Sequence, residues 1–133
     1  MTEQKSTHEL GVEGENAAAA YLTQRGYTIL ERNYRAKEGE IDLIALDGEV
    51  LVFVEVKMRT ATPAQSKYGR PLRAVNAAKK ERLRNAAKRY IADHSLIGKP
   101  ARIDVMEIYR SVRFGIPEYS IHYIAHAVGG SRT

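Results

Sequence analysis

Apolar residues recur along two segments of the chain at the three- to four-residue spacing of an amphipathic helix. The first segment follows Ser6-Thr7-His8-Glu9, which has the form of a capping box, and stops before Gly26. A helix is therefore expected over about residues 7–25. The second segment follows Asn76, a favourable N-cap residue, and predicts a helix that ends near Asp93. The apolar positions are Ala18, Ala19, Tyr21 and Leu22 in the first helix, and Leu83, Ala86, Ala87, Tyr90 and Ile91 in the second.

Five other segments are rich in β-branched and aromatic residues and predict strands, at about 27–34, 40–46, 50–58, 101–109 and 119–128. Segment 60–73 contains two prolines and a glycine and is expected to be a loop. The second helix separates the third and fourth strands, and such a crossover implies a parallel pair. We predict an α/β fold with a mixed five-stranded sheet flanked by helices. It should form one domain over residues 1–128, with a frayed tail at 129–133.

Asp47-Gly48 is typical of a two-residue hairpin turn between the second and third strands. With this turn Asp42 would face Phe53, Glu40 would face Glu55, and Glu38 would face Lys57. Side chains alternate along a strand, so one face of the hairpin would be wholly apolar. Its members would be Ile41, Leu43, Ala45, Val50, Val52, Val54 and Val56. The other face would be apolar near the turn and would end in a charged cluster of Glu40, Asp42, Glu55 and Lys57.

Three carboxylates crowded at one end of a sheet repel one another and lose hydration. A divalent cation would offset this repulsion, because hard oxygen ligands suit Mg²⁺. Lys57 could instead pair with one carboxylate in an ordinary salt-bridge cluster, and the chemistry of the residues leaves both readings open. Glu15 lies in line with the apolar stripe of the first helix. The helix dipole alone favours a glutamate there, but Glu15 would reach the cluster if the helix covered the polar-ended face.

Charge is distributed unevenly along the chain. Residues 1–56 carry 5 basic and 11 acidic side chains, residues 57–102 carry 13 and 2, and residues 103–133 carry 3 and 3. Such asymmetry favours a basic surface for a polyanion beside a separate acidic cluster, although a solvated basic helix that binds nothing has the same composition. The basic residues expected to contact phosphates are Arg59, Arg70, Arg73, Lys79, Lys80, Arg82, Arg84 and Lys88.

Composition excludes several classes of protein. The chain has no cysteine, so it has neither disulfides nor thiolate metal ligands. No apolar run is long enough to span a membrane, and the polar N-terminus lacks the apolar core of a signal peptide, so we expect a cytoplasmic protein. The four histidines show no zinc-type spacing and are expected to be surface or packing residues.

Several longer motifs resemble one known family. They are Gly11-x-x-Gly14-Glu15 with Ala18 and Tyr21-Leu22, the run Gly-Glu-Ile-Asp-Leu-Ile-Ala at 39–45, Val-Phe-Val-Glu-Val-Lys at 52–57, Lys79, and Arg-Ile-Asp-Val at 102–105. Over about residues 9–128 the chain is similar to the YraN-like bacterial family. That family in turn resembles the PD-(D/E)xK nucleases, above all Holliday-junction resolvases, which have a restriction-endonuclease-like fold. Ile41 departs from the superfamily pattern, which has proline before the motif aspartate, and Glu40 has no standard role in it.

The resemblance implies a metal-dependent endonuclease that hydrolyses phosphodiester bonds in structured or branched DNA. Glu15, Asp42, Glu55 and Lys57 would be catalytic. Mg²⁺, or Mn²⁺ in its place, would be held by Asp42, Glu55, the Val56 carbonyl and Glu15. DNA or another nucleic acid is the expected partner, with no membrane, and a homodimer is compatible with this reading. Two alternatives are a nucleic-acid-binding module with a vestigial site and an assembly factor that docks on RNA or protein.

Overall fold

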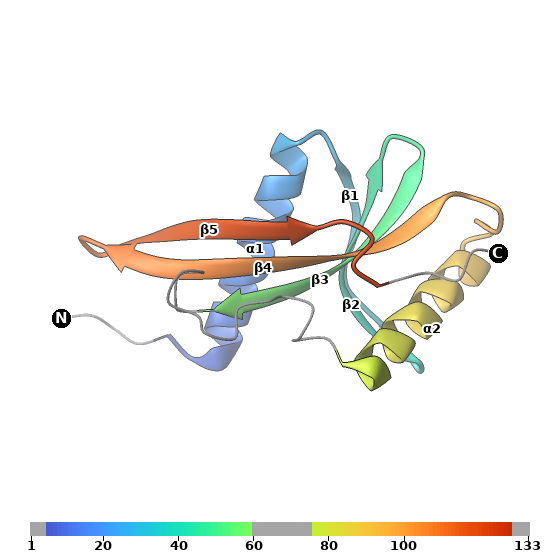
Figure 1. Ribbon diagram of the computed structural model, residues 1–133, viewed down its shortest axis with the longest axis horizontal. Helices are drawn as coiled ribbons and strands as arrows, with labels where there is room; N and C mark the ends of the chain where they lie inside the picture. Colours follow the sequence, from blue (N-terminus) through green and yellow to red (C-terminus); the bar gives the residue numbers. More distant parts are fainter. Residues whose placement is uncertain (1–4, 60–75, 129–133) are drawn as a thin grey trace.

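One mixed sheet of five strands organises the protein, with a helix packed on each face (Figure 1). This is a computed structural model, and residues 5–59 and 76–128 are described. In chain order the elements are α1 (Thr7–Gln24), β1 (Thr28–Ala36), β2 (Gly39–Asp47), β3 (Val50–Arg59), α2 (Ala77–Asp93), β4 (Ala101–Arg113) and β5 (Ile116–Ile124). The strands lie side by side in the order β1-β2-β3-β4-β5, and only β3 and β4 are parallel. The predicted α/β class and helix-flanked mixed sheet are confirmed, and they are consistent with a restriction-endonuclease-like fold.

Both helices begin where the sequence predicts. At the start of α1 the Ser6 hydroxyl accepts a hydrogen bond from the Glu9 backbone N–H, and the Glu9 carboxylate accepts one from the Ser6 N–H. At the start of α2 the Asn76 side chain accepts from the Lys79 N–H at 2.8 Å. These contacts satisfy backbone donors that have no partner inside the helix. Neither helix of the described part combines the length and the apolarity that crossing a membrane requires.

Two apolar clusters hold the helices to opposite faces of the sheet. Ala18, Ala19 and Leu22 of α1 pack with a group from the central strands that includes Val52 and Val54. The buried residues of α2 pack against the other face. That side comprises Leu83, Ala86, Ala87 and Tyr90 from the helix and Ile44, Leu51 and Phe53 from the sheet. Each large apolar side chain buried in this way contributes about 1.5–3 kcal/mol, so the two clusters fix the position of both helices.

The predicted register of the β2–β3 hairpin was wrong, although the turn lies where expected. The turn residues are Gly48 and Glu49 rather than Asp47 and Gly48, so Leu46 pairs with Leu51. Gly48 has φ 61°, as a type II′ turn requires at its first central position. The pairing ends at Leu43–Val54, one residue before Asp42 and Glu55. The corrected register therefore brings Asp42 alongside Glu55, not Phe53.

The alternation of faces along β2 breaks at Asp42. Ile41 packs in the α2 cluster, whereas Leu43 packs in the α1 cluster, so the prediction that both lie on one apolar face was wrong. In the β1–β2 register Asn33 falls opposite Asp42, between the Tyr34–Ile41 and Arg32–Leu43 pairs. Asn33 has φ 52°, a left-handed conformation that non-glycine residues seldom adopt. Regular alternation is therefore interrupted between Ile41 and Leu43, opposite the left-handed residue of β1.

The last two strands also differ from their predicted bounds. β4 continues to Arg113 and β5 begins at Ile116, so most of segment 110–118 is a projecting hairpin rather than a loop. Figure 1 shows this hairpin extending past the end of β3. Pro117 lies on the edge strand, where proline removes no required hydrogen bond. β5 ends at Ile124, and the predicted tail at 129–133 lies outside the described residues.

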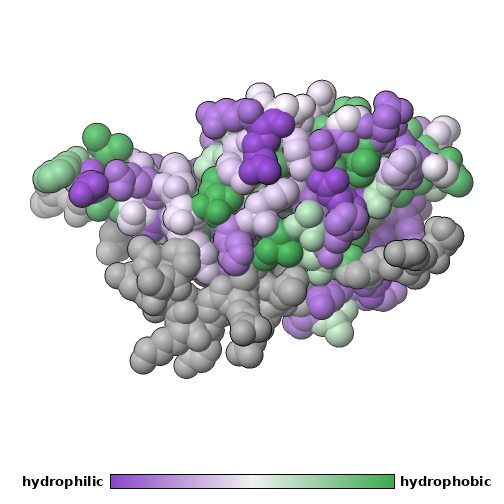
Figure 2. Space-filling model, turned by 45° about the horizontal axis from the view of Figure 1, so that its top comes forward, coloured by the Kyte–Doolittle hydropathy of each residue, from purple (hydrophilic) through white to green (hydrophobic). Residues whose placement is uncertain are grey.

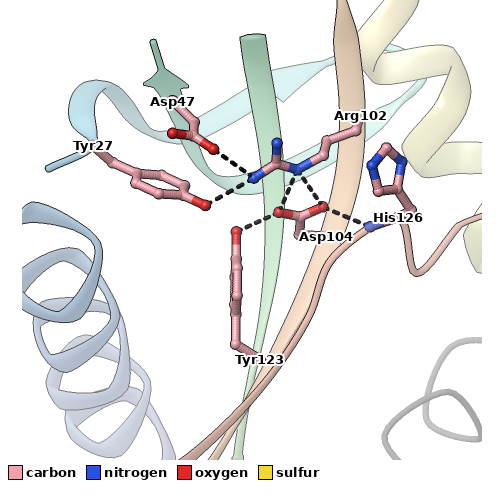
Figure 3. A network of polar contacts seen from close by, with 6 residues as sticks. All are labelled: Tyr27, Asp47, Arg102, Asp104, Tyr123 and His126. Carbon is pink, nitrogen blue, oxygen red and sulfur yellow. Dashed lines mark hydrogen bonds and ion pairs between the residues drawn. The ribbon is translucent and has the colours of Figure 1, made fainter. Parts of the chain in front are cut away.

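A largely buried polar network near the start of β4 links Tyr27 and Asp47, from the β1–β2 part of the chain, with Tyr123 of β5 (Figure 3). The Arg102 guanidinium donates to both carboxylate oxygens of Asp104 and also to Asp47. Asp104 is fully buried and accepts further bonds from the Tyr123 hydroxyl and the His126 N–H. Arg102 and Asp104 belong to a family-like motif of the sequence, and the structure gives that motif a role in holding the fold.

Candidate active site

Two carboxylates and two lysines meet in one cavity at the end of the sheet where β2 and β3 separate. Glu55 is nearly buried, and its Oε2 lies 2.6 Å from Nζ of Lys79 and 3.5 Å from Nζ of Lys57. Asp42 is half-buried, and its Oδ2 accepts a 2.7 Å hydrogen bond from the Val56 N–H. The cavity has a volume of about 370 Å³. Its lining residues are Glu40, Asp42, Glu55, Val56, Lys57, Lys79, Arg82 and Leu83.

Local structure explains why these side chains converge. Glu55 and Lys57 alternate with Val54 and Val56 along β3, so they project to the α2 face of the sheet. Lys79 lies in the first turn of α2, four residues before the buried Leu83, and so projects toward the same face. Gly39 allows this approach, because a Cβ atom there would lie 3.1 Å from the Arg82 carbonyl oxygen.

Burial and like charge make Asp42 a weak acid in the folded protein. Desolvation is the largest cause, followed by the negative charge of Glu55, and together they raise the pKa of Asp42 from 3.8 to about 7. The Val56 N–H and the Lys79 ammonium act in the opposite direction but are outweighed. The pair of Asp42 and Glu55 therefore holds a proton near neutral pH unless another cation replaces it.

The two lysines respond differently to the site. Desolvation, with the neighbouring Lys79, lowers the pKa of Lys57. Desolvation also opposes the charge on Lys79, but its hydrogen bond to Glu55 prevails and raises the pKa of Lys79. Lys79 is thus the firm counter-ion of Glu55. Lys57 is the more weakly held ammonium, and it is available to a further anion.

A second cavity adjoins the first, and Asp42 and Val56 line both of them. It has a volume of about 350 Å³. The remaining lining residues are His8, Gly11, Val12, Gly14, Glu15, Asn33, Arg35 and Met58. Glu15 therefore lies on the other side of Asp42 from Glu55 and Lys57.

The helix α1 does not cover the polar-ended face, which was the condition for Glu15 to reach the cluster. The helix packs on the apolar face, where the close approach of Gly14 to Met58 sets its distance from β3. Glu15 pairs instead with Arg32, with Oε1 and Nη1 3.5 Å apart. Within residues 5–59 and 76–128 no three acids or histidines are grouped to hold a metal ion. A role of Glu15 in metal binding stays a prediction. It would require either a bridging water molecule or a movement of the Glu15 side chain.

Asp42 and Glu55 alone fit a magnesium-type cation. Mg²⁺ uses one or two protein carboxylates and completes its shell with waters and substrate phosphates. Two adjoining carboxyl oxygens that retain a proton near pH 7 are a donor set of this kind, because a bound cation would displace that proton.

Lys79 and Arg82 line the cavity, and the other predicted phosphate-binding residues fall into three groups. Arg59 donates to the fully buried Glu107 at 2.8 Å, which holds the arginine just beyond Lys57 on β3. Lys80, Arg84 and Lys88 follow one another at four-residue intervals along α2 and so form one line on its surface. Arg70 and Arg73 lie outside the described residues.

The sequence prediction assigned Lys79 to phosphate contact and missed its place beside Glu55. A signal was present, because Lys79 falls on the apolar stripe of α2, four residues before Leu83 and in step with Ala86 and Tyr90. A lysine on the buried side of a helix needs an acidic partner. The prediction also missed Glu107, whose buried carboxylate accepts hydrogen bonds from Arg59 and from the Tyr109 hydroxyl.

Comparison with known proteins places the chain in a family. The model of the uncharacterised protein family UPF0102 matches residues 14–108. A UPF0102 protein of Alkaliphilus metalliredigens is 43% identical over 118 residues, which cover 89% of this chain and 96% of that protein. One from Symbiobacterium thermophilum is 49% identical over 102 residues, or 77% of this chain and 83% of the relative. The chain therefore belongs to the protein family UPF0102, the YraN-like family that its motifs indicated.

Proposed function

We propose that this protein is a metal-dependent endonuclease that hydrolyses phosphodiester bonds in structured or branched DNA. The observation that carries the proposal is the adjoining pair Asp42 and Glu55, with Lys57 and Lys79 at hydrogen-bonding or ion-pair distance of Glu55. A carboxylate pair can hold a metal ion for phosphodiester hydrolysis, and a loosely held lysine beside it can stabilise developing negative charge. The line of basic residues on the surface of α2, formed by Lys80, Arg84 and Lys88, begins one residue after Lys79. Phosphates bound along it would therefore lie beside the site.

Each residue of the site then has a separate task. Asp42 and Glu55 would hold Mg²⁺ or Mn²⁺, with the Val56 carbonyl and Glu15 as further oxygen donors. A cation bound there would polarise the scissile phosphate and lower the pKa of a water molecule. Lys79 fixes the orientation of Glu55 through the 2.6 Å contact. Lys57 would stabilise negative charge that develops on the phosphoryl oxygens, because its ammonium is only loosely paired at 3.5 Å.

A module that binds nucleic acid without cleaving it is the second candidate. One observation favours it: the described acids do not form a group of three, and Lys79 already neutralises Glu55. Such a protein would need the basic surface of α2 but would have no use for a metal.

Cleavage assays on a panel of labelled DNAs separate these functions. Four-way junctions, flaps, single strands and plain duplex are incubated with Mg²⁺, with Mn²⁺ and with a chelator. The proposal predicts metal-dependent cleavage of one of the branched forms by the wild type and none by Glu55→Gln. Glu118→Gln, on the exposed edge strand, is the matched control and should cleave normally. If no substrate is cut although DNA is bound, the binding module replaces the endonuclease.

A further inference from the structure

The tip of the β4–β5 hairpin exposes several large apolar side chains. Phe114 is 94% exposed, Ile116 64% and Val112 48%. The tip projects away from the rest of the molecule, and apolar residues colour the corresponding end of the space-filling view (Figures 1 and 2). Exposed apolar side chains gathered at one projecting point indicate a contact surface.

The turn itself carries a residue that its geometry disfavours. Arg113 pairs with Ile116, so Phe114 and Gly115 are the two turn residues, with φ 53° and 77°. Two positive φ values indicate a type I′ turn, which strongly prefers Asn-Gly. A bulky aromatic residue in the left-handed region is strained. Neither turn geometry nor solvation explains a phenylalanine here, whereas a contact made by its ring would.

The tip lies on the strand that runs beside the site. In the parallel β3–β4 register Lys57 pairs with Glu107 and Arg59 pairs with Tyr109. β4 then continues past the end of β3 to the turn, so Phe114 is seven residues beyond Glu107. At about 3.3 Å per residue this places Phe114 about 23 Å from the level of Lys57. That span matches about seven nucleotide steps of duplex at about 3.4 Å each.

The size and charge of the tip favour nucleic acid over a protein partner. A stable protein interface buries about 800 Å² on each side, which is far more than three side chains at the end of a two-stranded ribbon offer. Insertion between bases, in contrast, needs only one or two apolar side chains. Arg113, directly before Phe114, is not within ion-pair distance of a carboxylate in the described part of the chain, so its guanidinium can meet a phosphate.

We propose that Phe114, supported by Ile116, stacks on or inserts between bases of DNA held at the active site, at the point where the duplex branches or opens. This inference rests on the proposed function in that DNA must occupy the site. It adds the structural feature of the substrate that the protein recognises. A flat aromatic ring stacks on any base, so recognition would depend on unpaired or unstacked bases and not on sequence.

A single-tryptophan reporter tests the contact directly, because the wild-type chain contains no tryptophan. Phe114→Trp is titrated with a four-way junction and with plain duplex in chelator, while labelled DNA anisotropy reports binding independently. Ile97→Trp is the matched control, since Ile97 is 84% exposed and precedes β4 at its other end. The proposal predicts that the junction strongly quenches the emission of the Phe114→Trp variant, that duplex quenches it weakly, and that the control does not change.

Phe114→Asn provides a second test, in which weaker DNA binding could not be attributed to misfolding. Asparagine suits the type I′ turn, so this variant should melt at or above the wild-type temperature. It should nevertheless bind the junction about 5- to 150-fold more weakly than the wild type, as expected for the loss of one stacked base, with duplex affinity unchanged.

The outcomes distinguish this inference from the endonuclease itself. If anisotropy shows junction binding but the emission of Phe114→Trp is not quenched, the proposed base contact of Phe114 is overturned and the proposed function stands. If the emission is quenched but no DNA is cleaved, the base contact of Phe114 is supported and the endonuclease activity is overturned. Failure to bind any DNA overturns both, and a concentration-dependent emission shift without DNA would assign the tip to a second copy of the chain.

Discussion

Replacement of Asp42 by asparagine in the metal-free protein tests the electrostatics of the site most sensitively. Burial and the neighbouring Glu55 raise the pKa of Asp42 from 3.8 to about 7. Between these pH values the folded protein holds a proton that the unfolded chain has lost. Its stability therefore falls as the pH rises from about 4 to 7, and it stays reduced above 7. Asp42→Asn removes the ionisation while its amide oxygen can still accept from the Val56 N–H.

The magnitude follows from the size of the shift. A rise of about three pKa units corresponds to about 4 kcal/mol at most. The weaker hydrogen bond of a neutral acceptor to the Val56 N–H offsets about 1 kcal/mol or more of it. Asp42→Asn should therefore stabilise the metal-free protein by about 1–3 kcal/mol at pH 8. At pH 4 the difference should nearly vanish, because Asp42 is then protonated.

Urea denaturation in chelator at pH 4 and pH 8 measures this difference. The exposed Asp93, which pairs with Arg89 one turn away, provides the control Asp93→Asn. That substitution should change stability by less than about 0.5 kcal/mol at both pH values. Added Mg²⁺ should stabilise the wild type and not Asp42→Asn, since only the former keeps both carboxylates. A loss of stability in Asp42→Asn at pH 8 without metal would refute this reasoning and assign Asp42 to a structural salt-bridge cluster.

Three further outcomes follow from the structure. Asp104→Ala should destabilise the fold by about 3–5 kcal/mol in urea, because it leaves Arg102 without its buried partner, while Mn²⁺ affinity stays unchanged. Mn²⁺ affinity, measured by calorimetry, should rise from pH 6 to pH 8, since the cation must displace the proton of Asp42; a flat profile would remove Asp42 from the ligands. Lys80→Ala and Lys88→Ala should each reduce the slope of log affinity for DNA against log salt by about 1, and an unchanged slope would mean that α2 is only solvated surface.

Local signals in the sequence were sufficient for the elements and for their order. The capping box at Ser6 and the N-cap Asn76 located both helix starts, because caps depend on residues that are adjacent in the chain. The helical crossover between the third and fourth strands identified the parallel pair. The face of β3 that carries Glu55 and Lys57 was also predictable, since alternation along a strand does not depend on exact register.

Features set by tertiary packing were not predictable in the same way. The face of the sheet that α1 covers is a matter of tertiary packing, in which Gly14 of α1 lies close to Met58 of β3. Because α1 lies on that face, Glu15 is separated from Glu55. The break in alternation between Ile41 and Leu43 lies opposite the left-handed Asn33 of the neighbouring strand, and the sequence of β2 gives no sign of it. The β4–β5 hairpin is longer than the predicted strands, because β5 is an edge strand and such a strand tolerates Pro117.

The role of the Asp42–Glu55 cavity in catalysis is best tested by cleavage of a branched DNA in Mg²⁺ by Lys57→Ala and by the wild type. The substitution keeps both carboxylates and removes only the loosely paired ammonium beside them. Lys99→Ala, in the turn before β4, is the control. We expect Lys57→Ala to bind DNA with nearly wild-type affinity but to cleave it about 10²- to 10³-fold more slowly. Equal cleavage rates for the wild type and Lys57→Ala would contradict the account, because the cavity of Asp42 and Glu55 would then not be where the reaction occurs.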